Sequence, residues 1–300
     1  MNIKILYGLD DTTIDVSHIC TTRLIRNNVI TIPSGDHNRS NYFSDPIPNV
    51  LKKIYVVNGD NTVECDDTVV VRIDMIHGMA DRIDDLYINS MLNNIHSKLQ
   101  MKHGDFLVEV PEQKMSVRYL TGVENVLELG GNVGRNSLVI ASILKNYNNS
   151  NLVTLETDPD IAAQLRENRD VNNLNFQIEN SALSKRKLIQ RNWDTIQSDV
   201  LLDGYIEVNS ITYDELIAKY NIVFDTLVLD CEGAFYYILQ DMPEVLNNIK
   251  LIIMENDYHD IEHKKYIDSV LLYNNFYVDY VEPGGWGPCF DNFFEVWKRN

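Results

Sequence analysis

The strongest constraint on the fold is an alternation that begins near residue 116, where short apolar runs take turns with amphipathic stretches. The apolar runs cover 125–129, 152–156, 176–180, 226–230, 251–255, 276–281 and 293–297. Helical spacing between the first five of them predicts helices over 135–145, 159–171, 210–219 and 234–246. Short, fully apolar strands separated by helices are typical of a parallel sheet covered on both faces. We therefore expect an α/β fold with a doubly wound, mostly parallel, seven-stranded sheet.

The last two runs depart from this alternation. The segment 282–292 between them is rich in glycine and proline and is too short to hold a crossover helix. Strands joined by such a turn pair antiparallel. The sequence thus predicts a terminal antiparallel hairpin, which is not the usual ending of a dinucleotide-binding sheet.

The N-terminal quarter of the chain has a different pattern. Short apolar runs at 3–7, 29–32, 54–57 and 69–73 predict strands separated by polar turns, with no long helical period. Apolar residues then recur at helical spacing over about 81–99. We predict a small β-rich accessory domain over 1–74 and a main domain over 75–300 that begins with an amphipathic helix.

The charge of the chain limits its partners. There are 26 Lys and Arg against 44 Asp and Glu, a net charge of -18. This surplus repels phosphate backbones and anionic membranes, and it is compatible with neutral hydroxyl compounds and with cationic substrates. No run is long enough to cross a bilayer. We expect no nucleic-acid partner and no membrane partner.

The cysteines and the general composition bear on location. The four cysteines are scattered, with no C-x-x-C pair, which favours a reducing, cytoplasmic setting. Asn and Ile, both specified by A/T-rich codons, are common, as in the A/T-rich genomes of some large viruses. For a viral chain the expected compartment is the cytoplasm of the host.

A glycine-rich turn follows the first predicted strand of the main domain. Gly130, Gly131 and Gly134 let the backbone bend sharply and approach a ligand, and the helix that follows presents free N–H groups. Asn132 lies between these glycines. Glu128, at the strand end, would repel a pyrophosphate, whereas it suits the cationic amino-acid end of S-adenosylmethionine. The turn therefore favours that cofactor over a dinucleotide.

The next two strand ends complete this interpretation. Glu156 ends the second predicted strand, where a carboxylate can accept both hydroxyls of a ribose. Ser181 and Ala182 follow the third strand, where they would flank an adenine ring. Alternatively, these residues are ordinary strand ends and helix caps; their combination with the glycine turn favours a nucleoside cofactor.

Polar residues also follow the fourth and fifth predicted strands: Asp230, Glu232, Glu255, Asp257 and His259. The carboxyl ends of parallel strands meet at one edge, so these side chains are expected to converge. Methyl transfer to a hydroxyl needs a group that takes up a proton, and Asp230, Glu255 and His259 are the candidates.

The same oxygen-rich set could hold Mg²⁺, and Asp230, Glu232 and Asp257 are the metal candidates. Other interpretations stay open. Asp230 and Glu232 could cap the helix that starts at Ala234, and His259 could be a solvated surface residue. The aromatic residues of the hairpin loop, Trp286 and Phe290, could wall an acceptor site or simply anchor the hairpin.

In these motifs the chain resembles the FkbM-type methyltransferase family. The matching elements are 126–134, 156–159, 182–183, 227–234 and 252–255. The resemblance implies a Rossmann-like class I methyltransferase fold, in which Gly130, Asn132, Gly134 and Glu156 bind S-adenosylmethionine and the segment with Asp230 borders the acceptor. Glu128 stands where the family usually has Asp, and Phe235 stands where an acidic residue is common.

The leading hypothesis is an S-adenosylmethionine-dependent O-methyltransferase acting on a hydroxyl of a carbohydrate, such as a nucleotide-sugar or glycan, or of a related small molecule. The alternatives are a methyltransferase for protein side chains, to which acidic surfaces attract basic segments, and a non-catalytic binding module with the cofactor fold. An NAD-linked oxidoreductase fits the loop and the terminal hairpin poorly. The oligomeric state stays open, a homodimer included.

Overall fold

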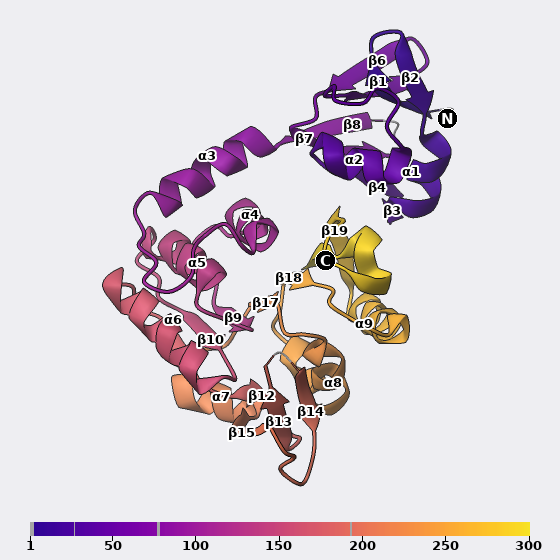
Figure 1. Ribbon diagram of the computed structural model, residues 1–300. Coiled ribbons are helices and arrows are strands. Elements are labelled where there is room, and N and C mark those ends of the chain that lie inside the picture. Colours follow the sequence, from indigo (N-terminus) through magenta and orange to yellow (C-terminus); the bar gives the residue numbers. More distant parts are fainter. Residues whose placement is uncertain (1–2, 27, 77–78, 193) are drawn as a thin grey trace.

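The computed structural model describes residues 3–26, 28–76, 79–192 and 194–300. Two β-rich sheets from the N-terminal part of the chain lie at one end, and a long helix leads from them to a large central sheet (Figure 1). None of the helices in these described residues is both long and apolar enough to cross a membrane.

The N-terminal part is built from two antiparallel four-stranded sheets around a shared apolar core. One sheet has the order β2-β1-β5-β6, with β1 at Ile3–Leu9, β2 at Thr12–Asp15, β5 at Lys53–Asn58 and β6 at Asn61–Cys65. The other has the order β3-β4-β7-β8, with β3 at Ile25–Arg26, β4 at Val29–Ile32, β7 at Val69–Asp74 and β8 at Met79–Asp84. Each predicted strand lies in one of these sheets.

Two features of this part differ from the sequence expectation. Two short helices, α1 at Ser17–Arg23 and α2 at Asp36–Phe43, pack on the sheets. They were not predicted, because the apolar residues in these segments do not recur at helical spacing. Strand β8 pairs with β7 as far as Asp84, so the boundary predicted at 75 falls inside a hairpin. The amphipathic helix predicted from 81 accordingly begins later, as α3 at Asp85–His96.

The central sheet confirms the predicted fold class. Its order is β11-β10-β9-β17-β18-β20-β19. The first five strands are parallel, and β20 pairs antiparallel with both of its neighbours, as the short last connection predicted. The strands are β9 at Val126–Leu129, β10 at Leu152–Leu155, β11 at Gln177–Glu179, β17 at Thr226–Leu229, β18 at Leu251–Glu255, β19 at Phe276–Glu282 and β20 at Phe294–Arg299.

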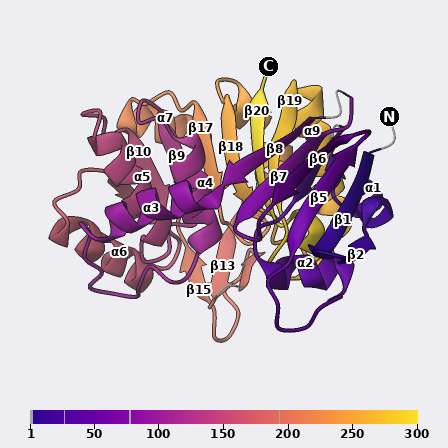
Figure 2. The ribbon, with the colours of Figure 1, turned by 90° about the horizontal axis from the view of Figure 1, so that it is seen from above.

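Alternate residues of each strand point to opposite faces of the sheet. Both sets are apolar here, so helices cover both faces. Leu127 and Leu129 join the core under α7 (Tyr213–Tyr220), α8 (Ala234–Asp241) and α9 (Ile261–Tyr273). Val126 joins the core under α4 (Val110–Tyr119), α5 (Arg135–Lys145) and α6 (Pro159–Val171). Figure 2 views the sheet from the side on which α3 and α4 lie.

Helix boundaries follow local capping. The helix predicted over 210–219 starts at Tyr213, because Thr212 and Glu215 form a capping box and Ser210–Ile211 is a short strand, β16. The helix predicted over 234–246 ends at Asp241, because the proline at 243 begins a separate 3-10 turn, Pro243–Leu246. Helices α4 and α9 were not predicted.

A β-rich insertion lies between β11 and α7. Strand β12, at Ala182–Leu183, pairs parallel with β16. A three-stranded sheet with the order β14-β13-β15 follows, with β13 at Leu188–Arg191, β14 at Asp194–Gln197 and β15 at Ile206–Val208. It projects from the end of the molecule opposite the N-terminal sheets (Figure 1).

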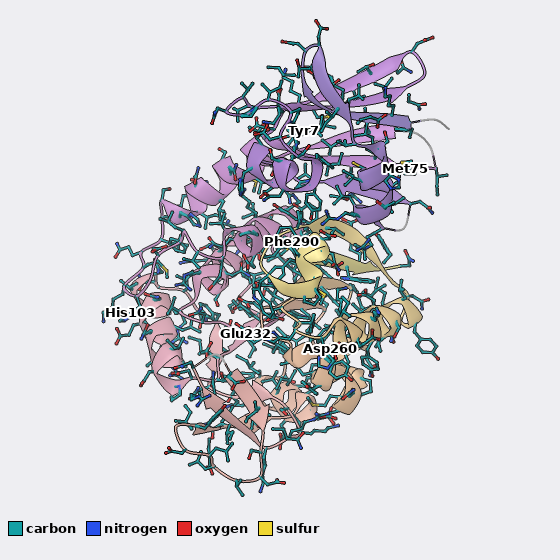
Figure 3. All side chains as sticks on the ribbon, turned by 45° about the vertical axis from the view of Figure 1, so that its right-hand side comes forward. Tyr7, Met75, His103, Glu232, Asp260 and Phe290 are labelled. Atoms are coloured by element: carbon teal, nitrogen blue, oxygen red, sulfur yellow. The ribbon has the colours of Figure 1, made fainter. Side chains whose placement is uncertain are left out.

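The N-terminal part docks onto the loop of the terminal hairpin. Arg23 donates to both carboxylate oxygens of Asp291, at 3.1 and 2.6 Å, and Tyr42 contacts the ring of Phe290. Figure 3 marks Phe290 on the side of the large sheet that faces the N-terminal sheets. Phe290 therefore anchors the interface between the two parts.

Candidate cofactor and acceptor site

The glycine-rich loop between β9 and α5 is fixed by close packing. Gly130 has a φ of +88°, and a Cβ there would lie 1.5 Å from the backbone oxygen of Asp230. Gly134 is the N-cap of α5 with a φ of +97°, and a Cβ there would lie 2.4 Å from Leu165 Cδ1. Glycine at these positions thus lets the loop pass directly against β17 and α6.

A cavity of about 360 Å³ opens beside this loop. Five of the predicted cofactor residues line it: Gly130, Asn132, Glu156, Ser181 and Ala182. The opposite wall comes from the insertion and from α8, and includes Arg186, Gln190, Tyr237 and Asp241. Gly131 and Gly134 do not line this cavity, and a Cβ on either would collide with Thr154 or Leu165.

Glu156 is held in place by the backbone around it. Its Oε2 accepts the N–H of Asn132 at 2.8 Å, and its Oε1 accepts the N–H of Asp158 at 2.9 Å. Burial raises the pKa of Glu156, and these two N–H donors counteract the rise. A carboxylate oxygen can accept more than one hydrogen bond, so the fixed side chain can also receive hydroxyl donors from the cavity.

Glu128 lies on the other face of the sheet, under α5. Its Oε2 accepts the hydroxyls of Ser137 and Thr154, and the side chain is 2 % exposed. Burial raises the pKa of Glu128 to about 7. Glu128 does not line the large cavity, so in this structure it does not reach a ligand there directly.

A second, much smaller cavity of about 10 Å³ lies between the loop and α4. Glu112, Asp230 and Glu255 each place one carboxylate oxygen within 4.8 Å of the others. Glu109 and Glu128 also border this cavity, and Gly130 and Asp230 line both cavities. Thus an acidic centre adjoins the predicted cofactor site.

Burial raises the pKa of all three carboxyls in this centre. The pKa of Asp230 is raised well above its usual range by burial and then by the charge of Glu255. Burial also raises the pKa of Glu112 and of Glu255, and a hydrogen bond between these two carboxyls raises that of Glu255 further. Without a cation the centre therefore retains protons at neutral pH.

The other predicted acidic and basic residues lie outside this centre. His259 is exposed, and its ring contacts Trp286 with the centroids 4.4 Å apart. Burial raises the pKa of Glu232, and His259 lowers it by its charge, so these two residues are neighbours. Asp257 accepts the N–H of Gly233 at 2.8 Å.

These contacts bear on two sequence expectations: helix capping by Asp230 and Glu232, and a metal site that includes Glu232 and Asp257. The N-cap of α8 is Gly233, and its N–H donates to Asp257 Oδ1, so neither Asp230 nor Glu232 occupies the N-cap position of that helix. Within the described residues, the three-carboxylate group contains Asp230 but neither Glu232 nor Asp257. The structure thus separates these two metal candidates from Asp230.

Two acidic residues of the site were missed in the sequence. Glu109 is the N-cap of α4 and accepts from Asn132 Nδ2 at 3.1 Å and from Arg135 at 2.8 Å. Glu112 lies one turn later on α4. The proline at 111 marks a helix start, but the sequence alone does not show that this helix packs against β18 and β20.

No protein-family model matches the chain, and no curated protein matches it. Similar solved structures include an O-methyltransferase from Bacillus cereus in complex with SAH, at 15% identity and a TM-score of 0.43, covering 71% of this chain and 91% of that one. A methyltransferase from Pyrococcus furiosus matches at 14% identity and a TM-score of 0.40, covering 72% and 95%. A ribosomal protein L11 methylase from Lactobacillus delbrueckii subsp. bulgaricus matches at 10% identity and a TM-score of 0.39, covering 64% and 78%. The fold assignment rests on the strand order of the chain itself.

Proposed function

We propose that the chain is an S-adenosylmethionine-dependent methyltransferase of the FkbM type. The observation that carries this proposal is the lining of the large cavity, where the glycine loop, Glu156 and Ser181–Ala182 meet. A cavity of about 360 Å³ is within the range of small-molecule sites. The terminal antiparallel hairpin supports a methyltransferase sheet over a dinucleotide-binding one.

The residues present fit this cofactor. Glu156 would accept the ribose hydroxyls, and Ser181 and Ala182 would flank the adenine. The acidic edge at Asp230 would attract the sulfonium charge of S-adenosylmethionine, which S-adenosylhomocysteine lacks. The bound cofactor supplies an electrophilic methyl group; the chain contributes orientation and the acceptance of a proton.

For the acceptor, we propose a hydroxyl of a carbohydrate or a related small molecule. Asp230 lines both cavities, so a carboxylate stands at the place where an acceptor would meet the cofactor. Asp230 or Glu255 would accept the proton that the acceptor hydroxyl loses on methylation, a role that requires one of these carboxyls to be ionised when the cofactor is bound. His259 lines neither cavity; its ring contacts Trp286.

A second acceptor class has its own support. The whole chain carries a net charge of -18. Such a field attracts basic peptide segments. A methyltransferase for protein side chains is therefore the alternative proposal.

Transfer of radiolabelled methyl groups tests these proposals. Nucleotide-sugars and free glycans form one acceptor panel, and basic peptides form the other. Asp230→Asn and His259→Ala should each keep S-adenosylhomocysteine binding while they lower turnover. If neither lowers turnover, the catalytic assignment is wrong even though the fold stands.

A further inference from the structure

The three carboxylates of the acidic centre come from elements far apart in the sequence. Glu112 lies in the first turn of α4, Asp230 follows β17, and Glu255 ends β18. One oxygen of each lies within 4.8 Å of the other two. Oxygens on opposite sides of a single ion are about 4 Å apart for Mg²⁺ and about 5 Å apart for Ca²⁺. The three side chains are therefore spaced as ligands of one cation.

The centre contains an acceptor that the protein does not satisfy. Glu112 is 7 % exposed and lines the small cavity, and no N–H or hydroxyl of the described residues donates to its Oε2. Its carboxyl is hydrogen-bonded to that of Glu255, so these two acids share a proton unless a cation replaces it. The nearby Arg135 is engaged by Glu109 at 2.8 Å. A buried carboxylate oxygen without a partner is costly, so this position calls for a positive ligand.

The volume of the small cavity selects the kind of cation. About 10 Å³ is close to the space of a single water-sized sphere. An alkylammonium or guanidinium group, with several heavy atoms, exceeds this space, whereas a monatomic ion fits it. Carboxylate oxygens alone favour a hard divalent ion over zinc or copper, which prefer nitrogen and sulfur ligands.

We propose that Glu112, Asp230 and Glu255 bind one hard divalent cation of the Mg²⁺ or Mn²⁺ class. This ligand set replaces Glu232 and Asp257 of the sequence prediction by Glu112 and Glu255. Because Asp230 lines both cavities, the ion would lie beside the molecule in the larger one. Its role there rests on the proposed function: a bound divalent ion lowers the pKa of a coordinated hydroxyl and so assists its attack.

Titration of the full-length protein with Mn²⁺, followed by electron paramagnetic resonance without cofactor or acceptor, tests the site. The wild type should bind one Mn²⁺ that Mg²⁺ displaces. Glu112→Gln should weaken Mn²⁺ binding by at least about tenfold, because it removes one of three anionic ligands. Glu124→Gln is the matched control, since Glu124 is a partly buried carboxylate that accepts from Thr121 and Gly122 elsewhere.

Binding of S-adenosylhomocysteine to the same samples separates this inference from the proposed function. Glu112→Gln should keep that binding, which also shows that the variant is folded. A wild type that binds S-adenosylhomocysteine but no Mn²⁺ overturns the cation site and leaves the methyltransferase proposal standing. Mn²⁺ binding unchanged in Glu112→Gln also overturns the assignment.

Discussion

Two carboxylate environments lie on either side of Gly130, and they differ in what surrounds the negative charge. Glu156 receives backbone N–H groups on both oxygens. The centre of Glu112, Asp230 and Glu255 instead gathers acids against one another, and none of the N–H or hydroxyl groups in the described part of the chain donates to Glu112 Oε2. The first environment holds an anion ready for neutral hydroxyl donors, whereas the second is completed by a cation. Residue type alone therefore does not tell what a carboxylate binds.

Gly130→Ala should destabilise the fold more than the other substitutions below, because the backbone at Gly130 packs directly against Asp230. Its Cβ would lie 1.5 Å from the backbone oxygen of Asp230, and its φ is +88°. Relief requires a backbone shift, and we expect a loss of about 3 kcal/mol or more in the free energy of unfolding. Denaturant unfolding measures it.

Gly59→Ala is the matched control for this prediction. Gly59 also has a positive φ, +61°, but a Cβ there meets nothing within 4 Å. Only the strain of the left-handed conformation remains, about 1–2 kcal/mol. Equal losses in the two variants would contradict the packing role assigned to Gly130.

Glu156→Ala tests the environment that is ready for hydroxyl donors. Removing its bonds to two ribose hydroxyls should cost about 2–4 kcal/mol of S-adenosylhomocysteine affinity, measured by calorimetry. Glu156→Gln, which keeps one acceptor oxygen, should lose less. Unchanged affinity in Glu156→Ala, with a normal thermal unfolding curve, would remove Glu156 from the cofactor site.

Glu128→Gln tests how much a buried carboxylate lowers the free energy of unfolding. Glu128 lies near both Glu156 and the acidic centre, and we expect a smaller effect here than for the two substitutions above. Burial raises the pKa of Glu128 from the usual 4.5 to about 7. Between these pH values the native state keeps a proton that the unfolded chain releases, so this group lowers stability as the pH rises. The variant should gain about 1–3 kcal/mol relative to wild type across that window.

Glu124→Gln should change stability in the opposite direction to Glu128→Gln. Burial raises the pKa of Glu124, but hydrogen bonds from Thr121 and Gly122 outweigh it and lower the pKa overall. An acid with a lowered pKa stabilises the native state above its unfolded pKa, so this variant should lose stability near neutral pH. If urea unfolding at several pH values gives both variants the same trend, the buried state of Glu128 is misassigned.

The fold could be predicted from local patterns because its strands are short, apolar and separated by clear helices. The terminal hairpin follows from its short connection, and the glycine loop was recognisable from its composition. The elements that were missed have weaker signals. Helix α9 has a polar first turn around Asp260 and Glu262, and the insertion between β11 and α7 consists of strands only two to four residues long.

The site was less predictable than the fold. Residues at strand ends, such as Asp230 and Glu156, could be placed because parallel strands end at one edge of a sheet. Glu112 could not, because its position depends on how α4 packs across β18, a tertiary contact with no local signal. Conversely, Asp257 was predicted to be a ligand, yet it lies outside the three-carboxylate group and its Oδ1 accepts the N–H of Gly233.

Calorimetric titration of the purified chain with S-adenosylhomocysteine, with NAD as the control, tests the central proposal most directly. The lining of the large cavity predicts micromolar binding of S-adenosylhomocysteine and no binding of NAD. Binding of NAD alone, or of neither ligand, would contradict the assignment of this cavity to S-adenosylmethionine.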